Sequence, residues 1–126
     1  MPFQANSIFQ PGFRLTDGSD WIKLFSLLYS SMYAITATGN AQATGYQLTS
    51  AINQVSVCGN GAGVVLPKNP VPGQPCSVRN DGQNACTVYG NGTDIVDGAA
   101  SASVTNAKGT SFQCYAPGKW MSVKGA

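Results

Sequence analysis

The chain of 126 residues contains no histidine and no glutamate, and charged residues make up only 10% of it. General acid–base catalysis and metal binding depend on histidines, carboxylates and thiolates that are brought together in a cleft. The five acidic residues are all aspartates, and those at positions 17, 81 and 97 precede a glycine, as is typical of tight turns. Asp81, Asp94 and Asp97 also lack the regular spacing of a calcium-binding loop. We therefore expect that the protein is not an enzyme and binds no cofactor and no metal ion.

Clusters of basic residues and long apolar runs are also missing. The net charge of +2 comes from seven scattered lysines and arginines, whereas nucleic-acid binding needs clustered ones that neutralise several phosphates. The longest apolar stretch, WIKLFSLLYSSMYA, begins at Trp21, is interrupted by Lys23 and is too short to span a bilayer. Twenty mostly polar residues precede it, which is unlike a signal peptide. We therefore expect no nucleic-acid partner, no membrane partner and no export.

The four cysteines, at positions 58, 76, 86 and 114, include no C-x-x-C pair, so a zinc site would need thiolates from four separate segments. Disulfide bonds are the alternative, since an even number of cysteines would suit them in an exported protein. Three cysteines instead share a strand face with an apolar neighbour: Cys76 with Val78, Cys86 with Val88, and Cys114 with Phe112. This pattern predicts four reduced thiols that are buried as small hydrophobic side chains.

Apolar residues recur at helical spacing near the start of the chain. One stripe consists of Trp21, Leu24, Phe25, Leu28 and Met32. The preceding TDGSD supplies residues that favour a helix N-terminus. The spacing predicts one helix over residues 19–34, preceded by an extended arm over residues 1–18. The apolar face is wider than one small sheet would cover, so the helix either packs only on its own domain or also contacts other copies of the chain. In the second case the five residues of the stripe form an assembly interface.

Residues 35–126 show alternating hydrophobicity, which predicts about eight short strands separated by glycine, proline, asparagine and aspartate clusters. The sequences NDGQNA, GNG, VDG and APGK are typical of hairpin connections. The stretch LPKNPVPGQPC, residues 66–76, contains four prolines and predicts an extended connection. The expected fold class is mainly β: an antiparallel β-sandwich or small barrel, preceded by the extended arm and the one short helix.

Several short β elements and their turns occur in a characteristic order: QLTSAIN, GVVLP, NDGQNACTVYG, IVDG and GKW. In this order, over roughly residues 12–120, the chain resembles a group of small virion proteins of tailed bacteriophages. The resemblance implies a non-enzymatic structural protein, a capsid decoration (cement) or head-fibre protein that is located in the virion after assembly in the host bacterial cytoplasm. It also implies a homo-oligomer, expected to be a trimer, that binds the major capsid protein or other virion proteins through the arm and helix. Members of this group carry valine, threonine or alanine where this chain has cysteines, which favours buried thiols.

A recognition module is the alternative function. A receptor- or glycan-binding tail-fibre or tip module would use exposed aromatic rings as stacking platforms, and the candidates are Tyr89, Tyr115 and Trp120. The direction in which these rings point distinguishes the two functions, because buried aromatic rings favour a structural role and rings around a shallow exposed groove favour recognition.

Overall fold

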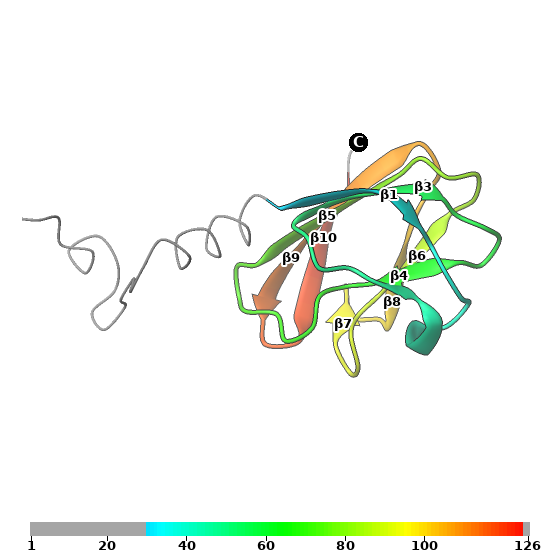
Figure 1. Ribbon diagram of the computed structural model, residues 1–126. Coiled ribbons are helices and arrows are strands. Elements are labelled where there is room, and N and C mark those ends of the chain that lie inside the picture. Colours follow the sequence, from blue (N-terminus) through cyan, green and yellow to red (C-terminus); the bar gives the residue numbers. More distant parts are fainter. Residues whose placement is uncertain (1–29, 125–126) are drawn as a thin grey trace, which may run out of the picture.

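The structure, a computed structural model, describes residues 30–124 and is built from two β-sheets (Figure 1). The strands are β1 (Ser31–Thr36), β2 (Tyr46–Gln47), β3 (Ile52–Val57), β4 (Gly63–Val65), β5 (Pro75–Asn80), β6 (Cys86–Tyr89), β7 (Ile95–Val96), β8 (Ser101–Val104), β9 (Lys108–Ala116) and β10 (Lys119–Lys124). One sheet has six strands in the order β1-β3-β5-β9-β10-β7, and the other has four in the order β2-β4-β6-β8. A single 3-10 turn, η1 (Gln42–Thr44), precedes β2.

The first six strands form a stacked coil that resembles a β-solenoid. Successive strands alternate between the two sheets, and strands that follow each other within one sheet are parallel. Ser31 of β1 pairs with Ile52 of β3, which pairs in turn with Ser77 of β5. In Figure 1, β1, β3 and β5 run together along the top of the view, with β4, β6 and β8 beneath them. Each turn of the chain therefore stacks on the previous one.

The strands after β6 extend the two sheets, and β8 and β9 run opposite to the strands that they join. β8 pairs antiparallel with β6, β9 pairs antiparallel with β5, and β10 pairs antiparallel with β9. The short strand β7 extends the six-stranded sheet by pairing parallel with β10. The edge strands are therefore β1 and β2 at the start of the stack, and β7 and β8 at its other end.

The hydrophobic core lies between the two sheets. Strict alternation in β5 and β9 turns Cys76, Val78, Phe112 and Cys114 inward, where all four are buried. From β10 the ring of Trp120 fills the space beside them and is fully buried. Together with the valines and leucines of the four-stranded sheet, these side chains form one cluster, whose burial provides the main driving force for folding.

The expected antiparallel sandwich or barrel is wrong, because the first three strands of each sheet pair in parallel. Of the four predicted hairpins only APGK joins paired neighbours, β9 and β10. The other three connect strands that lie in different sheets. Glycine and asparagine permit a sharp change of direction, but they do not decide whether the next strand returns to the same sheet.

The predicted helix over residues 19–34 is wrong at its end, because residues 31–34 belong to strand β1. Backbone pairing with β3 outweighs the helical spacing of the side chains there, and the backbone amide of Ile52 donates to the carbonyl oxygen of Ser30 (3.1 Å). Residues 30–124 contain no α-helix. The rest of the predicted helix and the predicted arm over residues 1–18 lie outside the described residues.

Candidate functional site

The outer side of the six-stranded sheet carries a shallow groove of about 360 Å³. The residues on the outward side of its strands, which we call the sheet face, are Ile52, Ser77, Arg79, Gly109, Ser111 and Val123. Strand register places them there, since Ile52 pairs with Ser77, Ser77 with Ser111, and Ser111 with Val123. One continuous row therefore crosses four strands, from β3 to β10.

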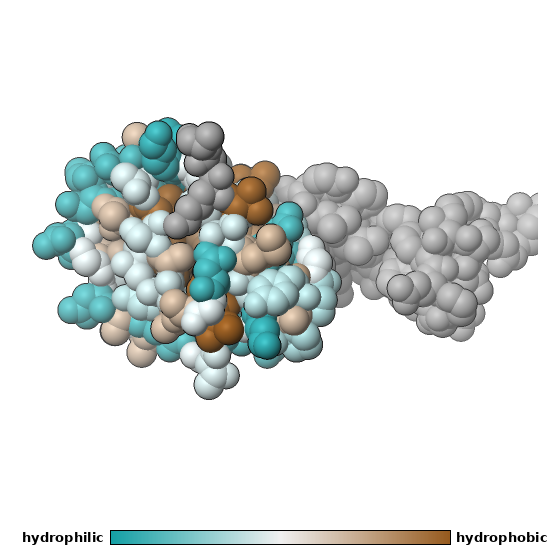
Figure 2. Space-filling view, turned by 180° about the vertical axis from the view of Figure 1, so that it is seen from behind, coloured by the Kyte–Doolittle hydropathy of each residue, from teal (hydrophilic) through white to brown (hydrophobic). Residues whose placement is uncertain are grey.

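Small side chains form the floor of the groove, and apolar side chains stand at its two ends. The hydroxyl oxygens of Ser77 and Ser111 lie 3.1 Å apart in the middle. Ile52 at one end and Val123 at the other are 56% and 51% exposed. Seen from behind, the molecule exposes apolar residues in a few separate patches among polar ones (Figure 2). Paired apolar ends around a small-residue floor give a surface on which another protein surface can pack closely.

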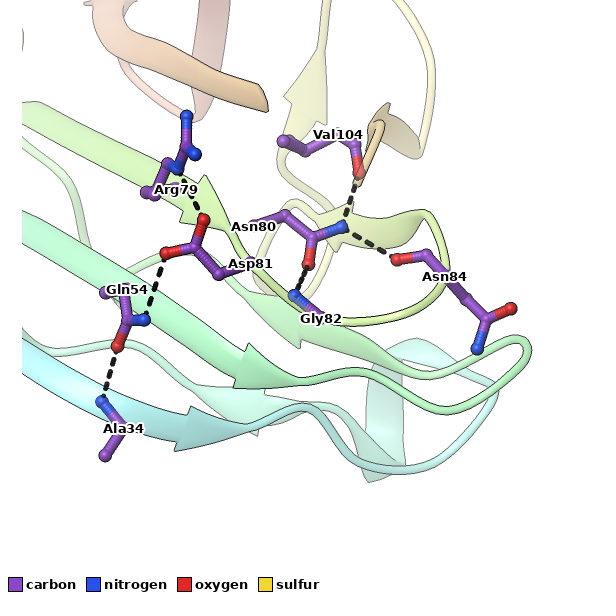
Figure 3. Close-up of polar contacts among 8 residues, drawn as sticks. All are labelled: Ala34, Gln54, Arg79, Asn80, Asp81, Gly82, Asn84 and Val104. Carbon is purple, nitrogen blue, oxygen red and sulfur yellow. Dashed lines mark hydrogen bonds and ion pairs between the residues drawn. The ribbon is translucent and has the colours of Figure 1, made fainter. Parts of the chain in front are cut away.

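The charge of Arg79 in the sheet face is neutralised by the adjacent Asp81. Arg79 Nε lies 2.7 Å from Asp81 Oδ1, and Gln54 Nε2 donates to Asp81 Oδ2 (3.0 Å) (Figure 3). The hydrogen bond from Gln54, and then that from Arg79, hold the pKa of Asp81 below its usual value. Gln54 in turn accepts a hydrogen bond from the backbone N–H of Ala34 in β1 (2.8 Å). These contacts connect β1, β3 and β5. The ion pair leaves the sheet face with little net charge.

A second candidate surface surrounds the loop that follows β4. Three shallow hollows of about 500, 560 and 350 Å³ adjoin there, because they share Gln47, Lys68, Asn69 and Asn91 between them. We call these four residues, together with Asp94, the loop surface. Chemically it offers amide groups, one ammonium and one carboxylate, which suits polar ligands.

Side-chain amides hold the loop surface in place. Gln42 Nε2 donates to the carbonyl oxygens of Gly90 and Gly92, both at 2.9 Å. Asn91 Nδ2 donates to Gln47 Oε1 (2.7 Å) and to the carbonyl oxygen of Leu66 (3.2 Å). These hydrogen bonds fix the loop between β6 and β7 against the coil.

The predicted recognition residues do not form one platform. Trp120 is fully buried, and its indole Nε1 has no hydrogen-bond partner among the described residues, so its prediction as a stacking surface is wrong. The reason is strand phase, because Trp120 pairs with the inward Cys114. Tyr115, one position later on β9, is 54% exposed. Tyr89 is half-buried on the other sheet, with its ring over Gly63.

Of the predicted assembly residues, only Met32 belongs to the described part of the chain. It lies on the edge strand β1 and is 40% exposed. Trp21, Leu24, Phe25 and Leu28 lie outside the described residues. The sequence analysis missed Ile52 and Val123. Strand alternation could have indicated them, because Ile52 lies on the opposite face of its strand from Val55, and Val123 on the opposite face from Trp120.

The prediction of free, buried thiols is confirmed, since all four cysteines are buried and unpaired. Burial raises the pKa of Cys76 to about 12, although a hydrogen bond from Asn53 Nδ2 to its sulfur (3.4 Å) acts in the opposite direction. Burial, with a smaller effect of the neighbouring Cys58 thiol, likewise raises the pKa of Cys86 to about 12. These two thiols are therefore protonated at neutral pH and poor nucleophiles.

Residues 30–124 contain no group of three or more histidine, cysteine, aspartate or glutamate side chains placed to hold a metal ion. Within the same range, no helix has the length and apolar character needed to cross a membrane. Comparison with protein-family models, with curated proteins and with solved structures finds no match to this chain.

Proposed function

We propose that the chain is a non-enzymatic structural protein of a bacteriophage virion, a capsid decoration (cement) or head-fibre protein that assembles with copies of itself. The observation that carries this is the sheet face, a low-charge surface with exposed apolar side chains at both ends of a small-residue groove. The order of short β elements in the sequence supports the virion assignment. The major capsid protein or another virion protein would be the second partner, and the virion the final location.

A second copy of the chain is the occupant that the sheet face fits best. Arg79 and Asp81 pair with each other, so an oppositely charged partner would gain little there. Ile52 and Val123 are separated by serines, so an apolar end of one copy can pack over the small-residue floor of another. Symmetric assembly would bury apolar area that a chain of this size leaves exposed.

Light scattering of the purified protein tests the assembly. We expect a mass near three times the 13.1 kDa of one chain. The double variant Ile52→Asp/Val123→Asp would place unpaired charges in the contact and shift the mass towards the monomer. Val71→Asp is the matched control, because Val71 is equally exposed, at 58%, but lies in the loop before β5.

Two further results separate the interface from the function. If Leu28→Asp dissociates the oligomer and the double variant does not, the contact lies in the predicted helix and not on the sheet face. A monomeric wild-type protein that also fails to sediment with shells of its virus would refute the structural function.

Recognition through the loop surface is the second candidate function, and its support is the three adjoining hollows held by Gln42 and Gln47. Calorimetry with bacterial surface polysaccharide tests it. Binding that is lost in Asn69→Ala but retained in the double variant Ile52→Asp/Val123→Asp, which changes only the sheet face, would favour recognition over the structural function.

A further inference from the structure

Two asparagines of the described chain precede a glycine, Asn60 and Asn91. An asparagine side chain can be attacked by the backbone nitrogen of the next residue, and a following glycine has no Cβ to hinder the approach. The structure gives these two asparagines very different surroundings, so that they need not share this reactivity.

Asn60 lies in an exposed tight turn between β3 and β4. The backbone N–H of Ala62 donates to the carbonyl oxygen of Gly59 (3.0 Å), and Gly61 has φ of +78°, so Asn60 and Gly61 are the two central residues of a β-turn. Neither the side chain of Asn60 nor the backbone N–H of Gly61 makes a hydrogen bond within the described residues. Beyond the turn itself, the nearest neighbour that a Cβ on Gly61 would meet is Asn40 at 3.9 Å. The reacting groups are therefore free to rotate towards each other.

Asn91 is held away from its glycine. Its Nδ2 donates to Gln47 Oε1 (2.7 Å) and to the carbonyl oxygen of Leu66 (3.2 Å), and Asn91 is half-buried. Both hydrogen bonds must break before the side chain can turn towards the nitrogen of Gly92. The backbone around it is fixed as well, since Gln42 holds the carbonyl oxygens of Gly90 and Gly92.

We propose that Asn60 is a site of spontaneous deamidation in the folded protein, and that Asn91 is protected. The deprotonated nitrogen of Gly61 attacks the side-chain carbon of Asn60; a carbon–nitrogen bond forms, and the bond to Nδ2 breaks with release of ammonia. Water then opens the resulting succinimide at either carbonyl, which gives aspartate or isoaspartate. No oxidant or reductant is needed, and a neutral amide becomes a carboxylate.

Modification at Asn60 would change the surface of the protein at one defined place. It lowers the net charge of +2 by one unit, at a turn where residues 58–63 include no cation. The isoaspartate product adds one carbon to the main chain of the turn. Because the turn is exposed and makes a single internal hydrogen bond, the fold can accommodate either product.

Peptide mapping by mass spectrometry, after incubation of the folded protein at mildly alkaline pH, tests this directly. We expect conversion at Asn60, and conversion at Asn91 at least about ten-fold more slowly, the factor expected when two hydrogen bonds must first break. The urea-unfolded chain is the reference, and there both asparagines should react at similar rates. Asn60→Gln should abolish the charge variant of the folded protein.

Gln47→Ala provides the decisive second variant, because it removes one of the two acceptors that hold Asn91. We expect faster conversion of Asn91 in this variant and an unchanged rate at Asn60. Equal rates at Asn60 and Asn91 in the folded wild-type protein would overturn the protective role of the hydrogen bonds. No conversion at Asn60 in the folded protein, under conditions where the unfolded chain reacts, would overturn the site itself.

Discussion

Replacing Asn80 with alanine should cost the protein a large part of its stability. Asn80 is the last residue of β5, faces inward and is fully buried. Its Nδ2 donates to the carbonyl oxygens of Asn84 (2.8 Å) and Val104 (2.9 Å), and its Oδ1 accepts from the N–H of Gly82 (2.9 Å) (Figure 3). One side chain thus satisfies three backbone groups and ties the turn after β5 to strand β8 of the other sheet.

The magnitude follows from those three hydrogen bonds. Each contributes on the order of 1 kcal/mol, and removing the side chain also leaves buried partners such as the N–H of Gly82 unsatisfied, so we expect a loss of about 3–4 kcal/mol. A domain of this size has a total stability of roughly 5–15 kcal/mol. The melting temperature should fall by about 10–15 °C.

Urea denaturation of the Asn80→Ala variant measures the loss, with the midpoint expected to fall and the slope to remain unchanged. Gln83→Ala is the control, because Gln83 is exposed in the same turn and its replacement should change the stability by less than about 0.5 kcal/mol. A loss below about 1 kcal/mol in Asn80→Ala would refute the reasoning, since it would mean that the three backbone groups find other partners.

Two other variants test the core and a close backbone approach. The pKa of the Cys76 and Cys86 thiols rises from 9.0 to about 12 on folding, so ionisation favours the unfolded chain above pH 9. At pH 10 each thiol should lower the free energy of unfolding by about 1.4 kcal/mol. In urea denaturation, the stability of the variant Cys76→Ala/Cys86→Ala should therefore decline less steeply with pH than that of the wild type. Gly90→Ala should lower the free energy of unfolding by about 2 kcal/mol or more in the same assay, since the added Cβ would clash with the carbonyl oxygen of Asp94. Gly59→Ala is the control and should be nearly neutral, because the added Cβ would meet open space.

The strand faces of this protein can be predicted from the sequence, whereas the strand partners cannot. Alternation alone places Cys76 and Val78 on one face of β5, and both are buried as expected. Alternation says nothing, however, about which strand lies alongside. The turn at Asp81-Gly82 fits a hairpin equally well, and it is the side chain of Asn80, bonded to Val104, that directs the chain into the other sheet. Such a contact between distant residues has no local signal.

The end of the predicted helix shows that local spacing does not decide between helix and strand. The stripe that ends at Met32 has helical spacing, but the segment from Ser31 onward also consists of residues that strands accept. An isolated segment has no means to choose between the two. Pairing with β3 decides the outcome, even though it requires Ala34 to adopt a φ of +58°, at a break in the ladder between β1 and β3.

The exposed apolar end of the sheet face also follows from a buried hydrogen-bonded residue. In β3 the polar Asn53 points inward, because its Nδ2 donates to the carbonyl oxygens of Ser50 (2.9 Å) and Ser77 (3.1 Å). Side chains alternate along a strand, so the same register must turn Ile52 outward, and a slip of one residue would reverse both. Val55, two residues further on, shares this inward phase and is fully buried. The exposure of Ile52 is therefore a consequence of the register that buries both Asn53 and Val55.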